Sequence, residues 1–136
     1  MLTSDEEQYW ILEQARVIAK NSYAPYSNFH VGCCVLYDNG DYFLGCNVEN
    51  ASFGLSLCAE RNALSNAVTA GEKGSIRAIG IVSLEQKNCL PCGACRQWFQ
   101  EFALLNNQDI KIIVEDNDGK AKAYKISELL PNPFVL

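Results

Sequence analysis

The sequence predicts an α/β fold: a three-layer α/β/α sandwich around one mixed, five-stranded sheet. Three observations predict it. The chain has 136 residues, the size of one ordinary domain. Segments with helical spacing of apolar residues alternate with short apolar or aromatic segments, in the order α-β-β-α-β-α-β-β-α. The chain contains no repeat, low-complexity tract or linker, so residues 1–136 are expected to form a single domain.

A helix is predicted over residues 4–20. Ser4 is a suitable first cap, and Glu7 three residues later completes the pattern of a capping box. The apolar side chains of this segment recur at helical spacing: Ile11, Leu12, Ala15, Ile18 and Ala19. The polar stretch that follows, up to Phe29, is expected to be a loop.

A hairpin and a second helix come next. Residues 31–37 and 42–48 are rich in aromatic and aliphatic residues, which favours two strands, and the Asn-Gly pair between them favours a tight turn. A loop of polar and small residues covers 49–56. A helix over about 57–70 then ends at a glycine, the residue that most often terminates helices.

The second half of the chain is expected to contain the remaining strands and helices. The run 78–84 is nearly all apolar, which suits a strand covered on both faces. The segment 120–125 carries three lysines in an alternating pattern, which suits an edge strand. The other elements expected here are a helix over 93–104, a strand over 110–115 and a short helix over 127–130.

The charge balance excludes some classes of partner. With 11 basic and 16 acidic residues the net charge is −5, opposite to the usual balance of proteins that bind nucleic acids. Residues 21–60 contain no Lys or Arg at all, which disfavours anionic ligands over that stretch. No apolar run is long enough to span a bilayer, and the acidic, polar start is unlike a signal peptide. We therefore expect a cytoplasmic protein that binds neither membranes nor nucleic acids.

Three of the seven cysteines form a pattern typical of a metal site. Cys58 opens the second helix, while Cys92 and Cys95 open the third and share one helical face. The positive end of a helix lowers the pKa of a thiol and favours the thiolate that metals bind. If the two helix starts converge, three thiolates can hold one zinc ion, which prefers such ligands in tetrahedral geometry. One zinc ion is therefore the expected cofactor.

A fourth cysteine decides whether this site is open or closed. Cys89 is the candidate, and four cysteines would make a closed, structural site. However, Leu90 precedes a proline and is biased toward an extended backbone, which makes it hard for Cys89 and Cys92 to reach one ion. An open fourth position, holding water, is favoured. The alternative is a noncatalytic interaction module stabilised by zinc.

Glu60 and two arginines lie beside these ligands. Glu60 is two residues after Cys58 and so is poorly placed as a ligand of the same ion, but it can reach a group bound beyond the zinc. A carboxylate next to activated water suits hydrolytic chemistry. Its plainer interpretation is a favourable charge at a helix start. Arg61 and Arg96 could each hydrogen-bond the sulfurs and offset their charge.

These motifs resemble the zinc-dependent cytidine deaminase family in its small homotetrameric form, whose signature includes three zinc-binding cysteines. The resemblance extends over nearly the whole chain. The segments that carry it are C-A-E at 58–60, P-C-G-A-C at 91–95, Y-A-P-Y-S-N-F-H-V-G at 23–32, G-C-N-V-E-N-A at 45–51 and E-L-L-P-N-P-F at 128–134.

The resemblance implies a role for each of these residues. Cys58, Cys92 and Cys95 would bind zinc, and Glu60 would move protons between water, ring N3 and the departing amino group. The backbone N–H of Ala59 would hold O2 of the base. Asn47 and Glu49 would hold the ribose hydroxyls, and Phe29 would pack on base and sugar. Phe134 would complete the pocket of a neighbouring subunit, so assembly would matter for activity, and the resemblance to the small homotetrameric form implies a homotetramer.

The sequence also narrows the substrate. Phe53 stands where many relatives carry Tyr, so a sugar contact made by that hydroxyl would be absent. The stretch free of basic residues contains most of the expected pocket, which favours free cytidine or 2′-deoxycytidine over a nucleotide. The alternatives are a deaminase of a modified cytosine nucleoside antibiotic and a C-x-x-C thiol oxidoreductase, although the latter leaves Cys58 and Glu60 without a role. His30, the only histidine, is expected to have no catalytic duty.

Overall fold

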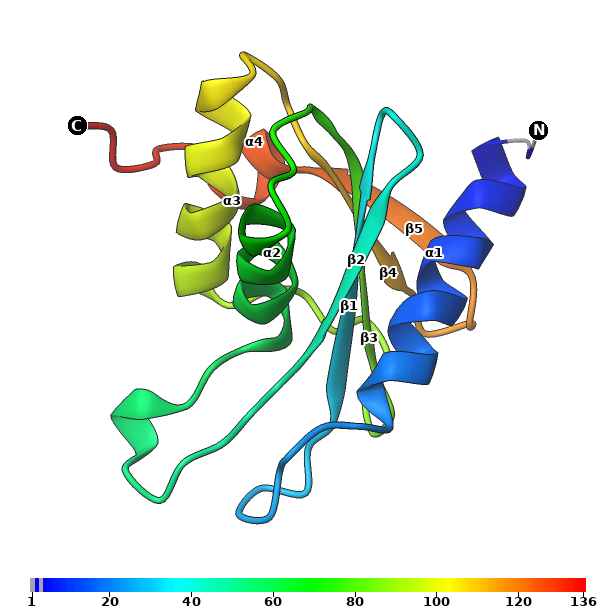
Figure 1. Cartoon of the computed structure of the whole chain (residues 1–136). Helices are drawn as coiled ribbons and strands as arrows, with labels where there is room; N and C mark the ends of the chain where they lie inside the picture. Colours follow the sequence, from blue (N-terminus) through cyan, green and yellow to red (C-terminus); the bar gives the residue numbers. More distant parts are fainter. Residues whose placement is uncertain (1, 3) are drawn as a thin grey trace.

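A computed structural model describes residue 2 and residues 4–136 of the chain (Figure 1). Its strands are β1 (Val31–Tyr37), β2 (Tyr42–Cys46), β3 (Ile76–Ser83), β4 (Lys111–Glu115) and β5 (Ala121–Lys125). Its helices are α1 (Ser4–Ala19), α2 (Ala59–Thr69), α3 (Gly93–Leu105) and α4 (Ile126–Leu129), with a 3-10 turn η1 (Phe53–Leu55). The first and third residues of the polar N-terminal stretch lie outside the described residues.

The five strands form one mixed sheet in the order β2-β1-β3-β4-β5. Only the β3–β4 pair is parallel, and the other three pairs are antiparallel. Helix α1 covers one face, while α2, α3 and α4 lie on the other (Figure 1). The predicted fold class is confirmed, including β5 as an edge strand.

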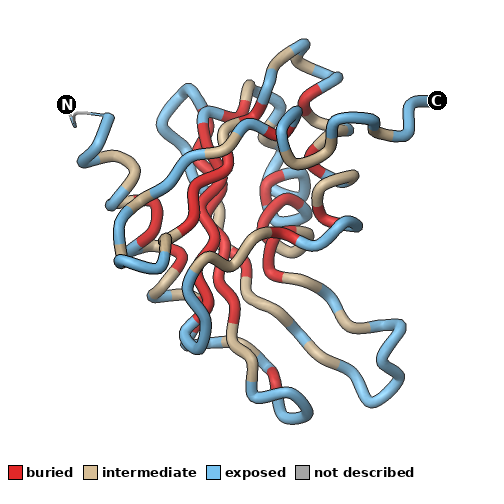
Figure 2. The backbone as a smooth tube through the Cα atoms, turned by 180° about the vertical axis from the view of Figure 1, so that it is seen from behind, coloured by how far each residue is buried: buried red, intermediate tan, exposed pale blue. Residues whose placement is uncertain are grey.

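The core is divided by the sheet into two apolar layers, and the buried chain in Figure 2 follows the strands and the helices that face them. Strand β1 serves both layers and is buried along its whole length. Cys33 and Val35 pack with α2 and α3, whereas Cys34 and Leu36 pack with α1. The small cysteines at 33 and 34 are therefore core residues, as the sequence predicted.

Two glycines allow helices to touch the sheet backbone. A Cβ at Gly32 would lie 1.9 Å from the carbonyl oxygen of Ala15 in α1. A Cβ at Gly45 would lie 2.3 Å from the backbone nitrogen of Ala63 in α2. Because these two residues have no side chain, α1 and α2 can pack directly against the backbone of the sheet. The contact at Gly45 also positions the start of α2.

Two strands and one helix differ from the predicted boundaries by two residues at one end; the helix predicted from about 57 starts at Ala59, after its cap Cys58. The strand predicted over 42–48 ends at Cys46. The Asn47 N–H still donates to the Val31 carbonyl at 3.2 Å, but the Val31 N–H donates to the side-chain Oδ1 of Asn47, at 2.9 Å, instead of to its carbonyl. Strand β3 starts at Ile76 rather than at 78, since the exposed Arg77 interrupts the apolar run without ending the strand. None of the described helices has the length and apolar character needed to cross a membrane.

Candidate metal centre and substrate pocket

The starts of α2 and α3 bring three cysteines together. Cys58 and Cys92 are the N-caps of the two helices, and Cys95 lies in the first turn of α3. Their sulfur atoms all lie within 4.8 Å of one another, and the Cys58 and Cys92 sulfurs are 3.9 Å apart. Zinc held by thiolates at about 2.3 Å in tetrahedral geometry requires sulfurs roughly 3.8 Å apart. The geometry and the chemistry of this donor set therefore fit zinc.

The surroundings of the cluster favour thiolate. A hydrogen bond from the Cys95 thiol lowers the pKa of Cys58, and contacts from Arg61 and Cys92 act in the same direction. The N-termini of two helices also point at this cluster, and their partial positive charge stabilises anions. Cys58 is therefore the thiol of the cluster that most readily becomes a thiolate, the form that binds a cation.

The two arginines have different roles. The Nη2 of Arg61 donates to the Cys58 sulfur at 3.6 Å, as predicted, and its buried Nε has no hydrogen-bond partner among the described residues. Arg96 does not follow the expectation. Its Nε and Nη1 donate to the carbonyls of Pro91 and Leu129, both at 2.8 Å. Arg96 directly follows Cys95 and is therefore turned by about 100° around the helix, toward α4.

Cys89 is not part of the three-sulfur cluster within the described part of the chain. It is half-buried and lies in the wall of the adjoining pocket. Burial raises its pKa to about 11, which favours the neutral thiol. This placement agrees with a metal site whose fourth position is open to the pocket.

The adjoining pocket has a volume of about 260 Å³. It brings together seven of the predicted site residues: Phe29, Asn47, Glu49, Cys58, Ala59, Glu60 and Cys92. The lining also includes Val31, Ser56, Leu57, Cys89 and Leu90. Cys95 lies behind the wall and is fully buried. The sequence thus predicted the polar side of the pocket better than its apolar side.

Glu60 is the buried carboxylate of this pocket, with only 4% of its surface exposed. Burial raises its pKa to about 7, and the neighbouring Cys58 adds to the effect. As the second residue of α2, it is positioned by the same contact of α2 with β2 that positions Cys58. A carboxyl group of this kind can both accept and return a proton near neutral pH.

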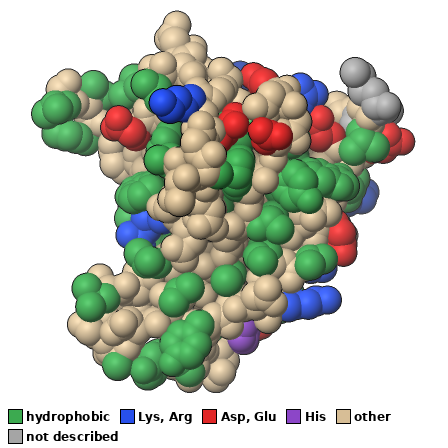
Figure 3. Space-filling view, in the orientation of Figure 1, with side chains coloured by type: hydrophobic (Ala, Val, Ile, Leu, Met, Phe, Trp, Pro, Cys, Tyr) green, Lys and Arg blue, Asp and Glu red, His purple; other side chains and the backbone are tan. Residues whose placement is uncertain are grey.

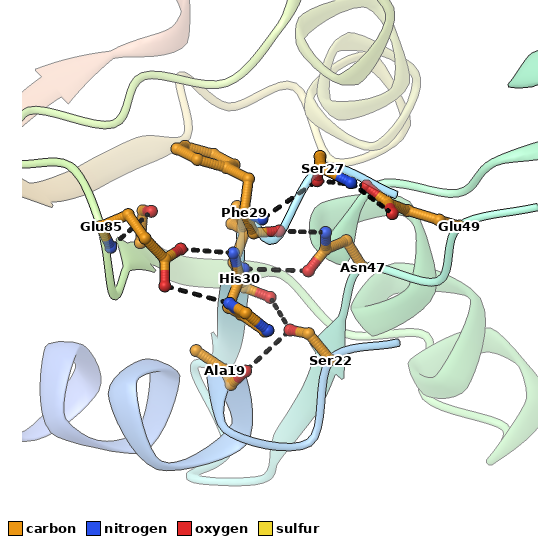
Figure 4. A network of polar contacts seen from close by, with 10 residues as sticks. Ala19, Ser22, Ser27, Phe29, His30, Asn47, Glu49 and Glu85 are labelled. Atoms are coloured by element: carbon orange, nitrogen blue, oxygen red, sulfur yellow. Dashed lines mark hydrogen bonds and ion pairs between the residues drawn. The ribbon is translucent and has the colours of Figure 1, made fainter. Parts of the chain in front are cut away.

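Asn47 and Glu49 brace the loop that carries Phe29 (Figure 4). Asn47 donates from Nδ2 to the Phe29 carbonyl at 2.8 Å. The carboxylate of Glu49 accepts hydrogen bonds from the N–H groups of Tyr26 and Ser27 and from the Ser27 hydroxyl. Each side chain still has hydrogen-bonding capacity beyond these contacts.

Two features of the site were not anticipated. Ser27 and Glu85 belong to the bracing network in Figure 4, although neither stands in a pattern that marks it in the sequence. Phe134 is not in the lining of this chain's own pocket. It lies on the tail after α4, where its backbone N–H and carbonyl are held by the side chain of Gln97 at 3.1 and 2.9 Å.

Comparisons with known proteins agree on one family. The family model for the cytidine and deoxycytidylate deaminase zinc-binding region matches residues 5–107. A cytidine deaminase of Mycoplasma genitalium is 40% identical over 125 residues, which cover 92% of this chain and 93% of that protein. One of Halalkalibacterium halodurans is 37% identical over 129 residues, 95% of each chain.

The fold gives the same result. The crystal structure of a cytidine deaminase from Burkholderia pseudomallei superposes with a TM-score of 0.83 at 36% sequence identity, and the match covers 98% of this chain and 100% of that one. This chain therefore belongs to the cytidine and deoxycytidylate deaminase family, whose zinc-binding region it contains.

Proposed function

We propose that the protein is a zinc-dependent hydrolase that converts cytidine and 2′-deoxycytidine, with water, to uridine and 2′-deoxyuridine and ammonia. The observation that carries the proposal is the shared pocket: a buried carboxylate, Glu60, faces the same cavity as a three-thiol cluster that fits zinc. Cys58, Cys92 and Cys95 would hold the ion. When bound, zinc supplies a nucleophile at neutral pH by lowering the pKa of water to about 7.

The chain's own residues supply binding and proton transfer. Phe29 and Ala59 both line the pocket; Phe29 would pack on the base and sugar, and the N–H of Ala59 would donate to O2 of the base. Asn47 and Glu49 offer polar atoms for the ribose hydroxyls. Glu60 takes a proton from water and delivers it to ring N3 as the water oxygen bonds to C4. It then transfers the remaining proton of that oxygen to the amino group, and the C4–N bond breaks to release ammonia and leave a C4 carbonyl. Arg61 steadies the ligand Cys58.

The charge of the pocket supports a free nucleoside as substrate. The described residues that line it include two glutamates and no Lys or Arg. A phosphate would lack a cationic partner and would be repelled by Glu49. The alternative substrate, a modified cytosine nucleoside antibiotic, is tested by comparing its kcat/KM with that of cytidine.

We also assign residues 1–136 to one domain that works in the cytoplasm as a homotetramer. All seven cysteines are free, which suits a reducing compartment. Exposed apolar side chains gather on the C-terminal tail, at the upper left of Figure 3, where a second copy could cover them.

The test is turnover by purified, zinc-loaded protein, followed as ammonia release from cytidine, deoxycytidine and cytidine monophosphate. Release that depends on enzyme and stops on chelation supports the proposal. A higher kcat/KM for the monophosphate contradicts the nucleoside assignment. A folded, zinc-bound protein that releases no ammonia contradicts the proposed catalysis and favours the noncatalytic zinc module. X-ray absorption spectroscopy that shows four sulfur ligands on the zinc would support that alternative.

A further inference from the structure

Glu85 holds one side of the loop that carries Phe29. It follows β3 and stands seven positions before Cys92. Its Oε1 accepts a hydrogen bond from the His30 backbone N–H at 2.6 Å, and its Oε2 lies 3.0 Å from Nδ1 of the His30 ring (Figure 4). One side chain therefore fixes both the peptide and the ring of His30.

The peptide groups around Phe29 are held from two sides. On the side opposite Glu85 in Figure 4, Asn47 donates to the Phe29 carbonyl and accepts from the Val31 N–H. The Phe29 N–H donates to the Ser27 hydroxyl at 3.0 Å. The backbone N–H groups of residues 29, 30 and 31 thus all donate to side-chain oxygens and not to the carbonyls of a neighbouring strand. Only the middle one depends on Glu85.

Glu85 is itself firmly placed. The backbone N–H of Leu84 donates to the His30 carbonyl at 3.0 Å, which extends the β1–β3 ladder by one residue. The N–H of Glu85 donates to the Ser83 hydroxyl at 3.2 Å. The same loop then continues to Cys89 and Leu90 in the pocket wall. Glu85 consequently ties the Phe29 side of the pocket to the loop that leads to the metal cluster.

We propose that Glu85 is a positioning residue for nucleoside binding: by holding the His30 peptide, it fixes the Phe29 ring in the wall of the pocket. The inference rests on the proposed function, in which Phe29 packs on the nucleoside. Glu85 does not line the pocket, so it acts on binding through Phe29 and not on the reacting atoms.

The test compares Glu85→Ala, Glu85→Gln and the wild type as zinc-loaded enzymes. Alanine removes the acceptor for the His30 N–H, and we expect the KM for cytidine to rise about three- to tenfold while kcat stays within about twofold. The dissociation constant of the product uridine, measured by calorimetry, should rise in parallel. Glutamine keeps an acceptor oxygen and should restore most of the affinity, which separates the hydrogen bond from the charge.

A matched control removes a similar contact elsewhere. The two carboxylate oxygens of Glu7 in α1 share a hydrogen bond from Nε of Arg77, at 2.7 and 2.9 Å, and Glu7 does not line this pocket. Glu7→Ala should leave the KM unchanged. His30→Ala keeps the peptide N–H, so its KM should rise less than that of Glu85→Ala.

The outcomes separate the two claims. A wild type that turns over cytidine, with Glu85→Ala at the wild-type KM and uridine affinity, overturns the positioning role alone. A lower melting temperature with unchanged KM also overturns it, since the contact would then be purely structural. A folded, zinc-loaded wild type that does not deaminate cytidine overturns the proposed function itself.

Discussion

At the scale of single residues, Glu60 is the side chain on which turnover should depend most. It is buried in the pocket, beside the cluster but not part of it. We predict that Glu60→Gln retains zinc and lowers kcat by two to four orders of magnitude, the usual contribution of a positioned proton-transfer group, about 10²–10⁴-fold. Steady-state kinetics and metal analysis of the same preparation check both parts. Loss of the metal would show that Glu60 also maintains the zinc site.

The two arginines allow a matched comparison, because only Arg61 contacts a sulfur atom. Arg61→Gln should weaken zinc binding about tenfold, the lower end of the effect of removing a partner of a metal ligand. Arg96→Gln should instead destabilise the fold by about 1–3 kcal/mol, because the carbonyls of Pro91 and Leu129 lose a charged donor in partly buried hydrogen bonds. Competition with a chelating dye and urea unfolding measure the two quantities. Equal weakening of zinc binding by both variants would contradict this division.

At this scale the three-cysteine cluster could be predicted from the sequence, but the hydrogen bonds that brace the site could not. Cys58, Cys92 and Cys95 carry their own spacing and lie at helix starts, so their convergence follows from the sequence pattern and the fold class. Arg96 and Glu85 are different. Their partners, Leu129 and His30, are 33 and 55 positions away along the chain, and only the tertiary arrangement brings them together.

At the scale of elements, the close packing of α2 against β2 should link the stability of the fold to the affinity for zinc. A Cβ at Gly45 would lie 2.3 Å from the Ala63 nitrogen and 2.5 Å from the Ala59 oxygen, both backbone atoms that cannot swing aside. Gly45→Ala should therefore push α2 off the sheet and lower the free energy of unfolding by at least about 1–3 kcal/mol. It should also weaken zinc binding, because Cys58 caps this helix.

Two other glycines serve as controls for Gly45→Ala. Gly32→Ala creates a comparable clash with α1, on the opposite face of the sheet, and should lower stability without weakening zinc binding in the folded protein. Gly54→Ala meets no atom within 4 Å and should change stability little. The measurements are urea unfolding and zinc titration. A Gly45→Ala protein with native zinc affinity would contradict the coupling.

Most of the helices and strands were predictable because their patterns of apolar and charged residues are distinct. The run 78–84 and the alternating lysines of 120–125 correctly indicated a buried strand and an edge strand. The ends of strands were less predictable. At Asn47 a side-chain oxygen replaces the backbone carbonyl as the acceptor for the Val31 N–H, and no periodicity in the sequence indicates that exchange.

At the scale of the whole molecule, Glu115 joins α1, β4 and the loop after β3. Its carboxylate accepts from Arg16 Nη2 at 2.6 Å and from Lys87 Nζ at 2.5 Å. Partial burial opposes ionisation, but the hydrogen bonds from Arg16 and Lys87 outweigh it and lower the pKa of Glu115. A carboxyl group whose pKa is lower in the folded state stabilises the fold above its unfolded pKa, and this contribution is lost as the pH falls through the folded pKa.

Glu115→Gln should accordingly lower the free energy of unfolding at pH 7 by about 1 kcal/mol, a modest value because both cations are partly exposed. The difference in the free energy of unfolding between variant and wild type should stay constant down to about pH 5. It should shrink below about pH 4, as Glu115 of the wild type becomes protonated first in the unfolded and then in the folded state. Urea unfolding at several pH values tests this. A difference that persists unchanged at pH 3 would mean that the charge of Glu115 contributes nothing.

Assembly is the last property at this scale, and we predict that it involves the C-terminal tail. Gln97 fixes the backbone of Phe134 by two hydrogen bonds, yet the residue is 70% exposed. A large aromatic residue held in place but left uncovered is suited to contact a second copy of the chain. If Phe134 completes a neighbour's pocket, Phe134→Ala should raise the KM for cytidine about tenfold, a loss of about 1.4 kcal/mol in binding.

Mixed assemblies distinguish a contribution to the neighbour from one within the same subunit. Co-expressed Glu60→Gln and Phe134→Ala chains should form tetramers in which some active sites receive Phe134 from an inactive neighbour. A component with the wild-type KM should then appear, although neither variant has it alone. Replacing the Glu60→Gln partner by the Glu60→Gln/Phe134→Ala double variant should abolish that component. If mass measurements show mixed tetramers that retain only the high KM, Phe134 does not act across the interface.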